Sequence, residues 1–193
     1  MKIAVTGPHC CGKSTVLKKV EEKLVQKYGR LEEVVFHSFS GKSSPIDYSS
    51  AQSLKNESNR ELLLTYWMLS KLIERECDFA LDIGGLHIYD RCVLDQIVYS
   101  DVLMSKENSK YIRDYVNFYC YKFPYDQVFV LPANYEILEK YGTKDKNPEY
   151  VEQICIRYNS LTSEYKNIVY LPLDQQEQVN IIMSYIENGM KRG

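Results

Sequence analysis

The stretch that decides the fold reads KIAVTGPHCCGKST over residues 2–15. It places a short apolar run, residues 3–5, directly before a turn rich in glycine, and an amphipathic stretch over residues 13–28 follows the turn. The apolar run is typical of a buried strand, and the later spacing of apolar residues is typical of a helix. We therefore expect a strand, a tight loop and a helix, in that order, at the start of the chain.

The loop has the spacing GxxxxGKS over residues 7–14, which is the Walker A pattern of a phosphate-binding loop (P-loop). Its glycines let backbone N–H groups wrap the phosphates of a nucleotide, and the positive end of the following helix reinforces that site. Lys13 is expected to reach the β and γ phosphates, and the Ser14 hydroxyl to ligate Mg²⁺. The predicted nucleotide-binding residues of the loop are Gly7, Cys10, Cys11, Gly12, Lys13, Ser14 and Thr15.

Four further apolar runs follow along the 193 residues, and helical patterns separate them. This alternation predicts an α/β domain of three layers, a P-loop NTPase fold with a five-stranded, mainly parallel sheet flanked by helices. The length fits one domain, which we expect to span residues 1–193. The expected strands cover residues 3–5, 34–39, 86–90, 127–131 and 167–171, and the expected helices cover 13–28, 54–77, 92–121 with a break near 105–108, two segments flanking 142–148, and 175–190.

Composition and charge exclude several classes of protein. The net charge of -2, with no long run of Lys or Arg, argues against a nucleic-acid partner and against the basic channel that a polynucleotide kinase needs. No apolar stretch reaches the length of a membrane span, so we expect no membrane partner. The six cysteines show no CxxC spacing of a zinc site, and free thiols favour a cytoplasmic location.

A second informative segment reads IYDRCVLDQIVY over residues 88–99. Asp90 closes an apolar strand, and a parallel sheet would bring it to the same edge as the P-loop. A carboxylate there can hold Mg²⁺ or accept a proton from an attacking hydroxyl, and Arg91 can stabilise charge on a transferring phosphoryl group. The predicted catalytic residues are therefore Lys13, Asp90 and Arg91, and the predicted metal ligands are Ser14 and Asp90.

The early P-loop, the Asp-Arg strand end and the five-stranded plan resemble the thymidylate kinase-like and deoxynucleoside kinase-like P-loop kinases. The pattern DRxxxDxxxY over residues 90–99 also resembles that of ribosylnicotinamide kinase-like ATPases. The order of elements agrees over most of the chain, whereas individual residues match in only these two segments. The resemblance implies an ATP-dependent kinase that transfers the γ-phosphate to a nucleoside or nucleoside monophosphate, and it suggests a homodimer.

On the acceptor side, the resemblance implies contacts from four residues in two helical segments. Asp95 and Tyr99 follow the Asp-Arg pair, and Arg60 and Tyr66 lie on the long helix before it. Two departures leave the acceptor open. Ser100 stands where thymidylate kinases usually carry Gln, and the stretch HSFSGK over residues 37–42 lacks the acid that deoxynucleoside kinases place after their second strand.

Small kinases of this type close a basic segment over the donor phosphates to exclude water. The candidate is residues 140–148, KYGTKDKNP, with Gly142 as a hinge and three lysines as its charge. Because it contains no arginine, Arg157 in the following helix is a candidate for contact with the phosphates instead. A solvated charged loop is the alternative interpretation of this segment.

Two other functions share a P-loop with kinases. A GTPase switch is favoured by the DxxG match at residues 82–85, but TKDK at residues 143–146 lacks the final acid of a guanine-recognition motif. A regulatory ATPase module would use hydrolysis to change its affinity for a partner, and we find no sensor or arginine-finger pattern for it. The kinase interpretation, with ATP, Mg²⁺ and a small-molecule acceptor, therefore leads.

Overall fold

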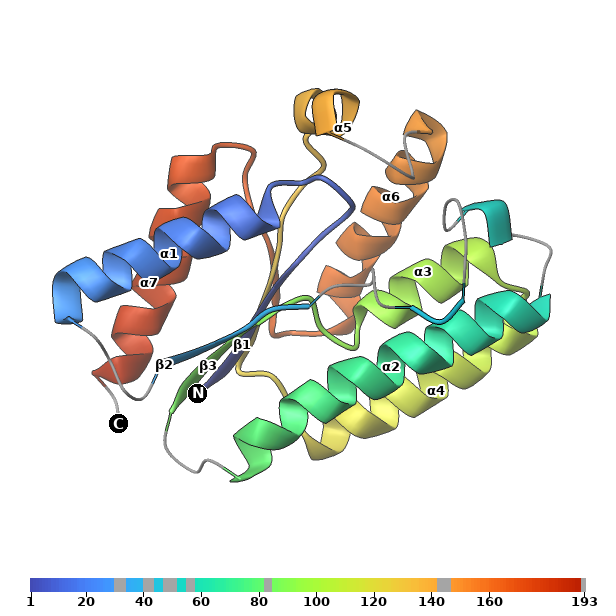
Figure 1. Cartoon of the computed structure of the whole chain (residues 1–193), viewed down its shortest axis with the longest axis horizontal. Coiled ribbons are helices and arrows are strands. Elements are labelled where there is room, and N and C mark those ends of the chain that lie inside the picture. Colours follow the sequence, from blue (N-terminus) through green and yellow to red (C-terminus); the bar gives the residue numbers. More distant parts are fainter. Residues whose placement is uncertain are drawn as a thin grey trace.

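A computed structural model gives the arrangement of the chain (Figure 1). It describes residues 1–29, 34–39, 44–46, 52–54, 58–81, 85–141 and 147–191. Five strands form one sheet with helices on both faces, so the predicted three-layer α/β fold is confirmed.

The sheet has the strand order β2-β3-β1-β4-β5, and every neighbouring pair is parallel. Its strands are β1 (Lys2–Thr6), β2 (Val34–His37), β3 (Leu86–Asp90), β4 (Gln127–Val130) and β5 (Ile168–Tyr170). Central β1 pairs with β3 on one side and β4 on the other, with Val5 opposite Asp90. Because all strands run the same way, their carboxyl ends meet at one edge, and the loop after β1 lies at that edge between β3 and β4.

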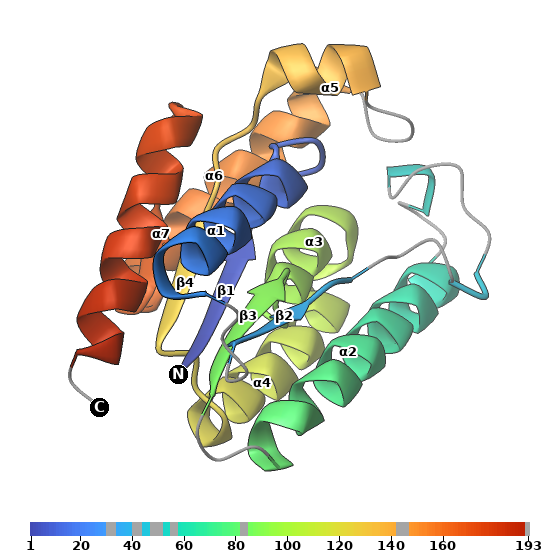
Figure 2. The ribbon, with the colours of Figure 1, turned by 60° about the vertical axis from the view of Figure 1, so that its left-hand side comes forward.

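Helices cover the two faces of the sheet unequally (Figures 1 and 2). One face carries α1 (Lys13–Tyr28) and α7 (Gln175–Met190), and the other carries α2 (Ser58–Leu81), α3 (Asp95–Leu103), α4 (Lys106–Lys122) and α6 (Pro148–Glu164). The short helix α5 (Tyr135–Tyr141) lies beyond the carboxyl edge, and a single turn of 3-10 helix covers Gln52–Leu54. None of the described helices combines the length and apolar character needed to cross a bilayer.

Side chains alternate between the two faces along each central strand. Ile3 and Val5 of β1 and Ile88 of β3 pack with α1 and α7, whereas Ala4 and Tyr89 pack with the helices of the other face. All five are completely buried. This continuous burial explains why the strands appear in the sequence as unbroken apolar runs, as expected for a parallel sheet covered on both sides.

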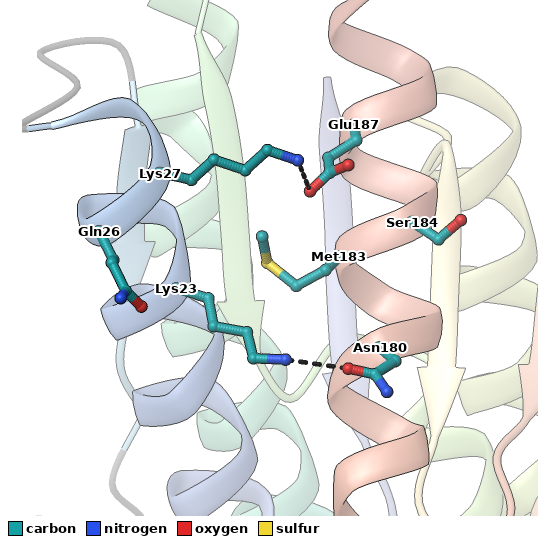
Figure 3. Close-up of a pocket in the computed structure, with 7 residues that line it drawn as sticks. All are labelled: Lys23, Gln26, Lys27, Asn180, Met183, Ser184 and Glu187. Atoms are coloured by element: carbon teal, nitrogen blue, oxygen red, sulfur yellow. Dashed lines mark hydrogen bonds and ion pairs between the residues drawn. The ribbon is translucent and has the colours of Figure 1, made fainter.

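A polar seam joins α1 to α7 (Figure 3). Lys23 and Lys27, one turn apart on α1, reach Asn180 at 2.9 Å and Glu187 at 2.7 Å on α7. The side chain of Met183 lies between these two contacts. The helix that begins at the phosphate loop is thereby fixed to its neighbour over its last two turns.

The predicted boundaries differ from the observed ones at several elements. The helix expected over residues 54–77 begins at Ser58 and ends at Leu81, and the strand expected over 34–39 ends at His37. The break expected near 105–108 falls at Met104 and Ser105, where the Ser105 side chain accepts a hydrogen bond from the Asn108 N–H and begins α4. Residues 142–146 of the predicted lid and most of the DxxG match, residues 82–84, lie outside the described residues.

Candidate active site

The loop after β1 has the backbone of a P-loop. Gly7, Cys10 and Gly12 all adopt positive φ, at 144°, 54° and 89°. A methyl group on Gly7 would lie 2.5 Å from the carbonyl oxygen of Leu131, so no other residue fits at that position without moving the backbone that follows β4. Positive φ values within a turn create the concave backbone that binds anions, which supports the predicted phosphate site.

Lys13 lies against the loop that precedes it. Its Nζ donates to the carbonyl oxygens of Pro8 at 2.7 Å and Gly7 at 3.1 Å, and it lies 3.3 Å from Cys11 Sγ. The side chain is buried, whereas Ser14 beside it is exposed at the start of α1. The ammonium group is therefore held at the mouth of the loop, where the phosphates of a nucleotide would lie.

Helix α5 forms an outer wall of this loop. Ile137 Cδ1 lies 3.6 Å from the position of a methyl group on Gly12. Cys10 packs against a small buried cluster that includes Leu138 of α5 and Val151 of α6. The loop is thus enclosed between the sheet edge and these two helices.

Asp90 lies at the same edge of the sheet as the loop, as predicted from its place at a strand end. Burial raises the pKa of its carboxyl group, and the nearby charges of Lys13 and Arg91 oppose that rise. Its Oδ1 is buried, and no donor in the described part of the chain reaches it. A carboxylate oxygen of this kind, together with the exposed Ser14 hydroxyl, fits the hard oxygen ligands that Mg²⁺ prefers.

Arg91 is fixed immediately after the strand. Its backbone N–H donates to Val5 at 2.9 Å, and its φ of 70° is left-handed, which is uncommon for a residue with a side chain. Its Nη1 lies 3.3 Å from Asp95, which is almost completely buried and also accepts a hydrogen bond from the Thr6 hydroxyl. Tyr99 lies within electrostatic reach of the guanidinium. The structure thus brings together Asp90, Arg91, Asp95 and Tyr99.

The sequence analysis missed Arg75, on α2. Its guanidinium donates to the backbone carbonyl oxygens of Asp90 at 2.7 Å, Arg91 at 2.8 Å and His37 at 3.2 Å. These three carbonyls lie at the ends of β2 and β3. An isolated arginine on an amphipathic helix gives no signal in the sequence, because its partners lie far away along the chain.

The sequence analysis also gave no role to His9, at a variable position of the loop. Its ring lies 5.6 Å from the ring of Tyr99, so the imidazole lies between the phosphate loop and α3. Burial lowers the pKa of His9 well below its usual value, and the charges of Arg91 and Lys13 lower it further. A neutral imidazole is therefore expected beside the two cations.

Three predicted site residues lie away from this cluster. Arg157 contacts Asp101 and pairs with Glu164 at 2.7 Å, so its contacts in the structure are with α3 and its own helix. Tyr66 and Arg60 are exposed on α2, and at 1.5 Å per residue they lie about 14 and 22 Å along the axis from Arg75. This half of α2 continues past the ends of β2 and β3 (Figure 2).

The strand order and the loop geometry define a P-loop α/β protein. A family model described as an AAA domain matches residues 2–176, which is most of the chain, and the chain belongs to this family. No curated protein sequence matches it.

The fold is similar to that of deoxyadenosine kinase from M. mycoides in three solved structures. The TM-scores and sequence identities are 0.66 and 20% for the form with dATP, 0.70 and 18% for the form with dCTP, and 0.65 and 17% for the form with dCMP and dCDP. Each match covers 97% of this chain and 100% of the other. At these identities the likeness establishes the fold, which is the P-loop kinase-like fold that the sequence predicted.

Proposed function

We propose that this protein is an ATP-dependent kinase that transfers the γ-phosphate to a nucleoside or nucleoside monophosphate. One observation carries the proposal: the register of the sheet sets Val5, just before the P-loop, opposite Asp90, so the phosphate loop and the Asp-Arg turn lie side by side. A bare phosphate-binding loop would not need a buried carboxylate and a fixed guanidinium at its mouth. Phosphoryl transfer uses both. The nucleotide-bound kinases with the same fold add support.

In this proposal each residue of the site has its own role in phosphoryl transfer. Lys13 and the loop N–H groups would hold the β and γ phosphates, and Arg91 would contact the phosphoryl group as charge develops on it. Asp95, buried against Arg91, would position it. Asp90 would accept the proton of the acceptor hydroxyl or, with Ser14, hold Mg²⁺. When bound with ATP, Mg²⁺ would neutralise part of the phosphate charge.

The test is ATP consumption with nucleosides, nucleoside monophosphates and nicotinamide riboside as acceptors. Lys13→Ala and Asp90→Asn should each lower turnover by about 100-fold or more, because each removes a group that acts on the transferring phosphoryl or its acceptor. Lys27→Met, which removes a contact at the end of α1 distant from the phosphate loop, should leave turnover unchanged. Near-normal transfer by both site variants would show that the assignment is wrong.

An ATPase without a small-molecule acceptor is the second candidate, because the family to which the chain belongs is described as an AAA domain. Phosphate release that does not depend on any acceptor would favour this function. A strong preference for guanine nucleotides with slow turnover would favour a GTPase switch. Consumption of nicotinamide riboside alone would assign a ribosylnicotinamide-type kinase.

The proposal includes a homodimer, a cytoplasmic location, and a lid over residues 140–148. The dimer has a candidate surface in the exposed aromatic side chains along α4 and just after it, which are Tyr111, Tyr115, Phe118, Tyr121 and Phe123. Large exposed apolar patches often mark interfaces. Light scattering should give twice the mass of the chain, and Phe118→Glu should reduce it to that of one chain. A monomeric wild-type protein would contradict this part.

A further inference from the structure

The turn that carries Asp90 and Arg91 is held by a side chain from another layer of the molecule. Arg75, on α2, donates from Nη1 to the carbonyl oxygen of Asp90 at 2.7 Å and from Nη2 to that of Arg91 at 2.8 Å. The same Nη1 reaches the carbonyl oxygen of His37 at 3.2 Å. One guanidinium thus joins two consecutive carbonyls of the catalytic turn to the end of the neighbouring strand.

The turn needs such support. The strand ends at Asp90, and α3 does not begin until Asp95, so the carbonyls in between have left the ladder of the sheet. Arg91 adopts φ of 70°, a conformation that persists in a residue with a Cβ only where its surroundings hold it. Backbone carbonyls in a partly buried turn also need donors. Those of Cys92, Val93 and Leu94 accept from the N–H groups at the start of α3, and Arg75 supplies donors to those of Asp90 and Arg91.

Arg75 is itself held in place. Its guanidinium lies over the ring of Tyr89 at 5.0 Å and near that of Phe39 at 5.6 Å, and its stem belongs to a long helix. A planar guanidinium presents two N–H groups side by side, which matches a pair of adjacent carbonyl oxygens. A lysine ammonium has a single point of attachment and cannot reproduce this geometry.

We propose that Arg75 is a positioning residue of the phosphoryl-transfer site, a role that rests on the proposed function. By fixing the main chain at residues 90 and 91, it aims the Asp90 carboxylate and the Arg91 guanidinium at the phosphate loop. It touches neither ATP nor acceptor. It also connects this turn to α2 and to the end of β2.

The test compares Arg75→Ala and Arg75→Lys with the wild-type protein. Displacement of catalytic groups by about 1 Å can cost roughly 100-fold in rate, so we expect kcat to fall by about 10- to 100-fold. The KM for ATP should hardly change, because the P-loop is a separate segment. Millimolar guanidinium should restore part of the kcat of Arg75→Ala by occupying the vacated site, and should not raise the kcat of the wild type.

The matched control is Lys27→Met, which also removes one cation and one contact between elements, but on the opposite layer (Figure 3). Its kcat should equal that of the wild type, with no response to guanidinium. A wild-type kcat in Arg75→Ala, or in Arg75→Lys, would overturn the proposal while leaving the kinase function in place. Rescue that also appears in the control would overturn it too.

A second measurement separates the failure of this proposal from failure of the proposed function. Hydrogen exchange of the backbone amides over residues 91–94 should be faster in Arg75→Ala than in the wild type and in Lys27→Met, because the turn loses its support. If the wild-type protein transfers phosphate to no acceptor, the kinase function is wrong, and the exchange result still decides whether Arg75 holds the turn. Unchanged exchange would overturn that role.

Discussion

At the scale of single residues, Gly7 combines a strained backbone with a lack of space. Its φ of 144° disfavours any residue with a Cβ, and an added methyl would lie 2.5 Å from a backbone oxygen. Gly29, at the end of α1, has φ of 75° but no atom within 4 Å of an added methyl. The pair therefore separates backbone strain from steric overlap.

Gly29→Ala should lower the free energy of unfolding by about 1–3 kcal/mol, because its backbone conformation is accessible to glycine almost alone, and it should leave nucleotide binding unchanged. Gly7→Ala should cost roughly 1–3 kcal/mol more, because overlap with the Leu131 carbonyl adds to the strain. It should also weaken ATP binding, since the loop must move. Urea unfolding and nucleotide titration of both variants measure this, and equal losses in the two would contradict the steric argument.

His9 gives a prediction for stability against pH. Its pKa in the folded state is lowered by burial and by Arg91 and Lys13, whereas the unfolded chain has the ordinary value near about 6.5. As pH falls below that value, His9 is protonated in the unfolded state but stays neutral in the folded state. The free energy of unfolding should then fall by up to about 1.4 kcal/mol per pH unit.

His9→Asn removes this dependence, so the variant should lose less stability than the wild type between pH 7 and pH 5. The other two histidines, His37 and His87, are present in both proteins, so the comparison isolates the effect of His9. Denaturant unfolding at the two pH values provides the measurement. Equal losses would mean that His9 accepts a proton in the folded state.

At the scale of elements, a buried ion pair connects β1 to α2 at the amino edge of the sheet. Lys2 Nζ lies 2.7 Å from Glu76, and both side chains are almost completely buried. Tyr119 donates to the same carboxylate at 2.8 Å, and Tyr125 donates to its other oxygen. Lys2 also lies 4.1 Å from the ring centroid of Tyr125. One cluster thereby joins a central strand, α2 and the end of α4.

Removing one partner leaves a buried charge without compensation, so Lys2→Met and Glu76→Leu should each cost about 3–5 kcal/mol. The double variant should be less destabilised than the sum of the two, because neither charge then remains. Asp114→Asn, in an exposed pair with Lys110, should change stability little and serves as the control. Additive losses in the double variant would show that the pair is not coupled.

The sequence predicted those elements whose signals are local. The observed bounds of α1, β3 and α7 coincide with the expected ones, because a glycine, a strand-ending Asp and a capping Asp174 mark their ends. Features that depend on tertiary partners were not predictable. On α2, Leu63 and Tyr66 are one turn apart, as in an apolar helix face, yet they are 60% and 48% exposed.

The residues of the candidate site also differ in whether a local sequence signal predicts them. The P-loop and the Asp-Arg pair could be predicted because a few adjacent residues form a recognisable motif in each case. Arg75 and His9 could not, since their partners are reached only through the fold. Glu76 is buried in the middle of a helix, which periodicity alone treats as a solvent-exposed position. Polar residues with distant partners, both in the site and at the opposite edge of the sheet, are therefore what sequence patterns miss.

At the scale of the whole molecule, the phosphate loop joins the central strand β1 to the helix layer of α1 and α7. It faces the Asp90–Arg91 turn, which Arg75 of the opposite helix layer holds. A ligand that binds only the folded state at 100 times its Kd stabilises it by about 2.7 kcal/mol, which is roughly 5–10 °C in Tm for a chain of this size. Because we expect residues 1–193 to form one domain, ATP with Mg²⁺ should shift a single thermal transition as a unit. Lys13→Ala should show little shift at the same ligand concentration. Two resolved transitions, with only one moved by the nucleotide, would contradict the single domain, and an equal shift in Lys13→Ala would contradict the assignment of the phosphate site.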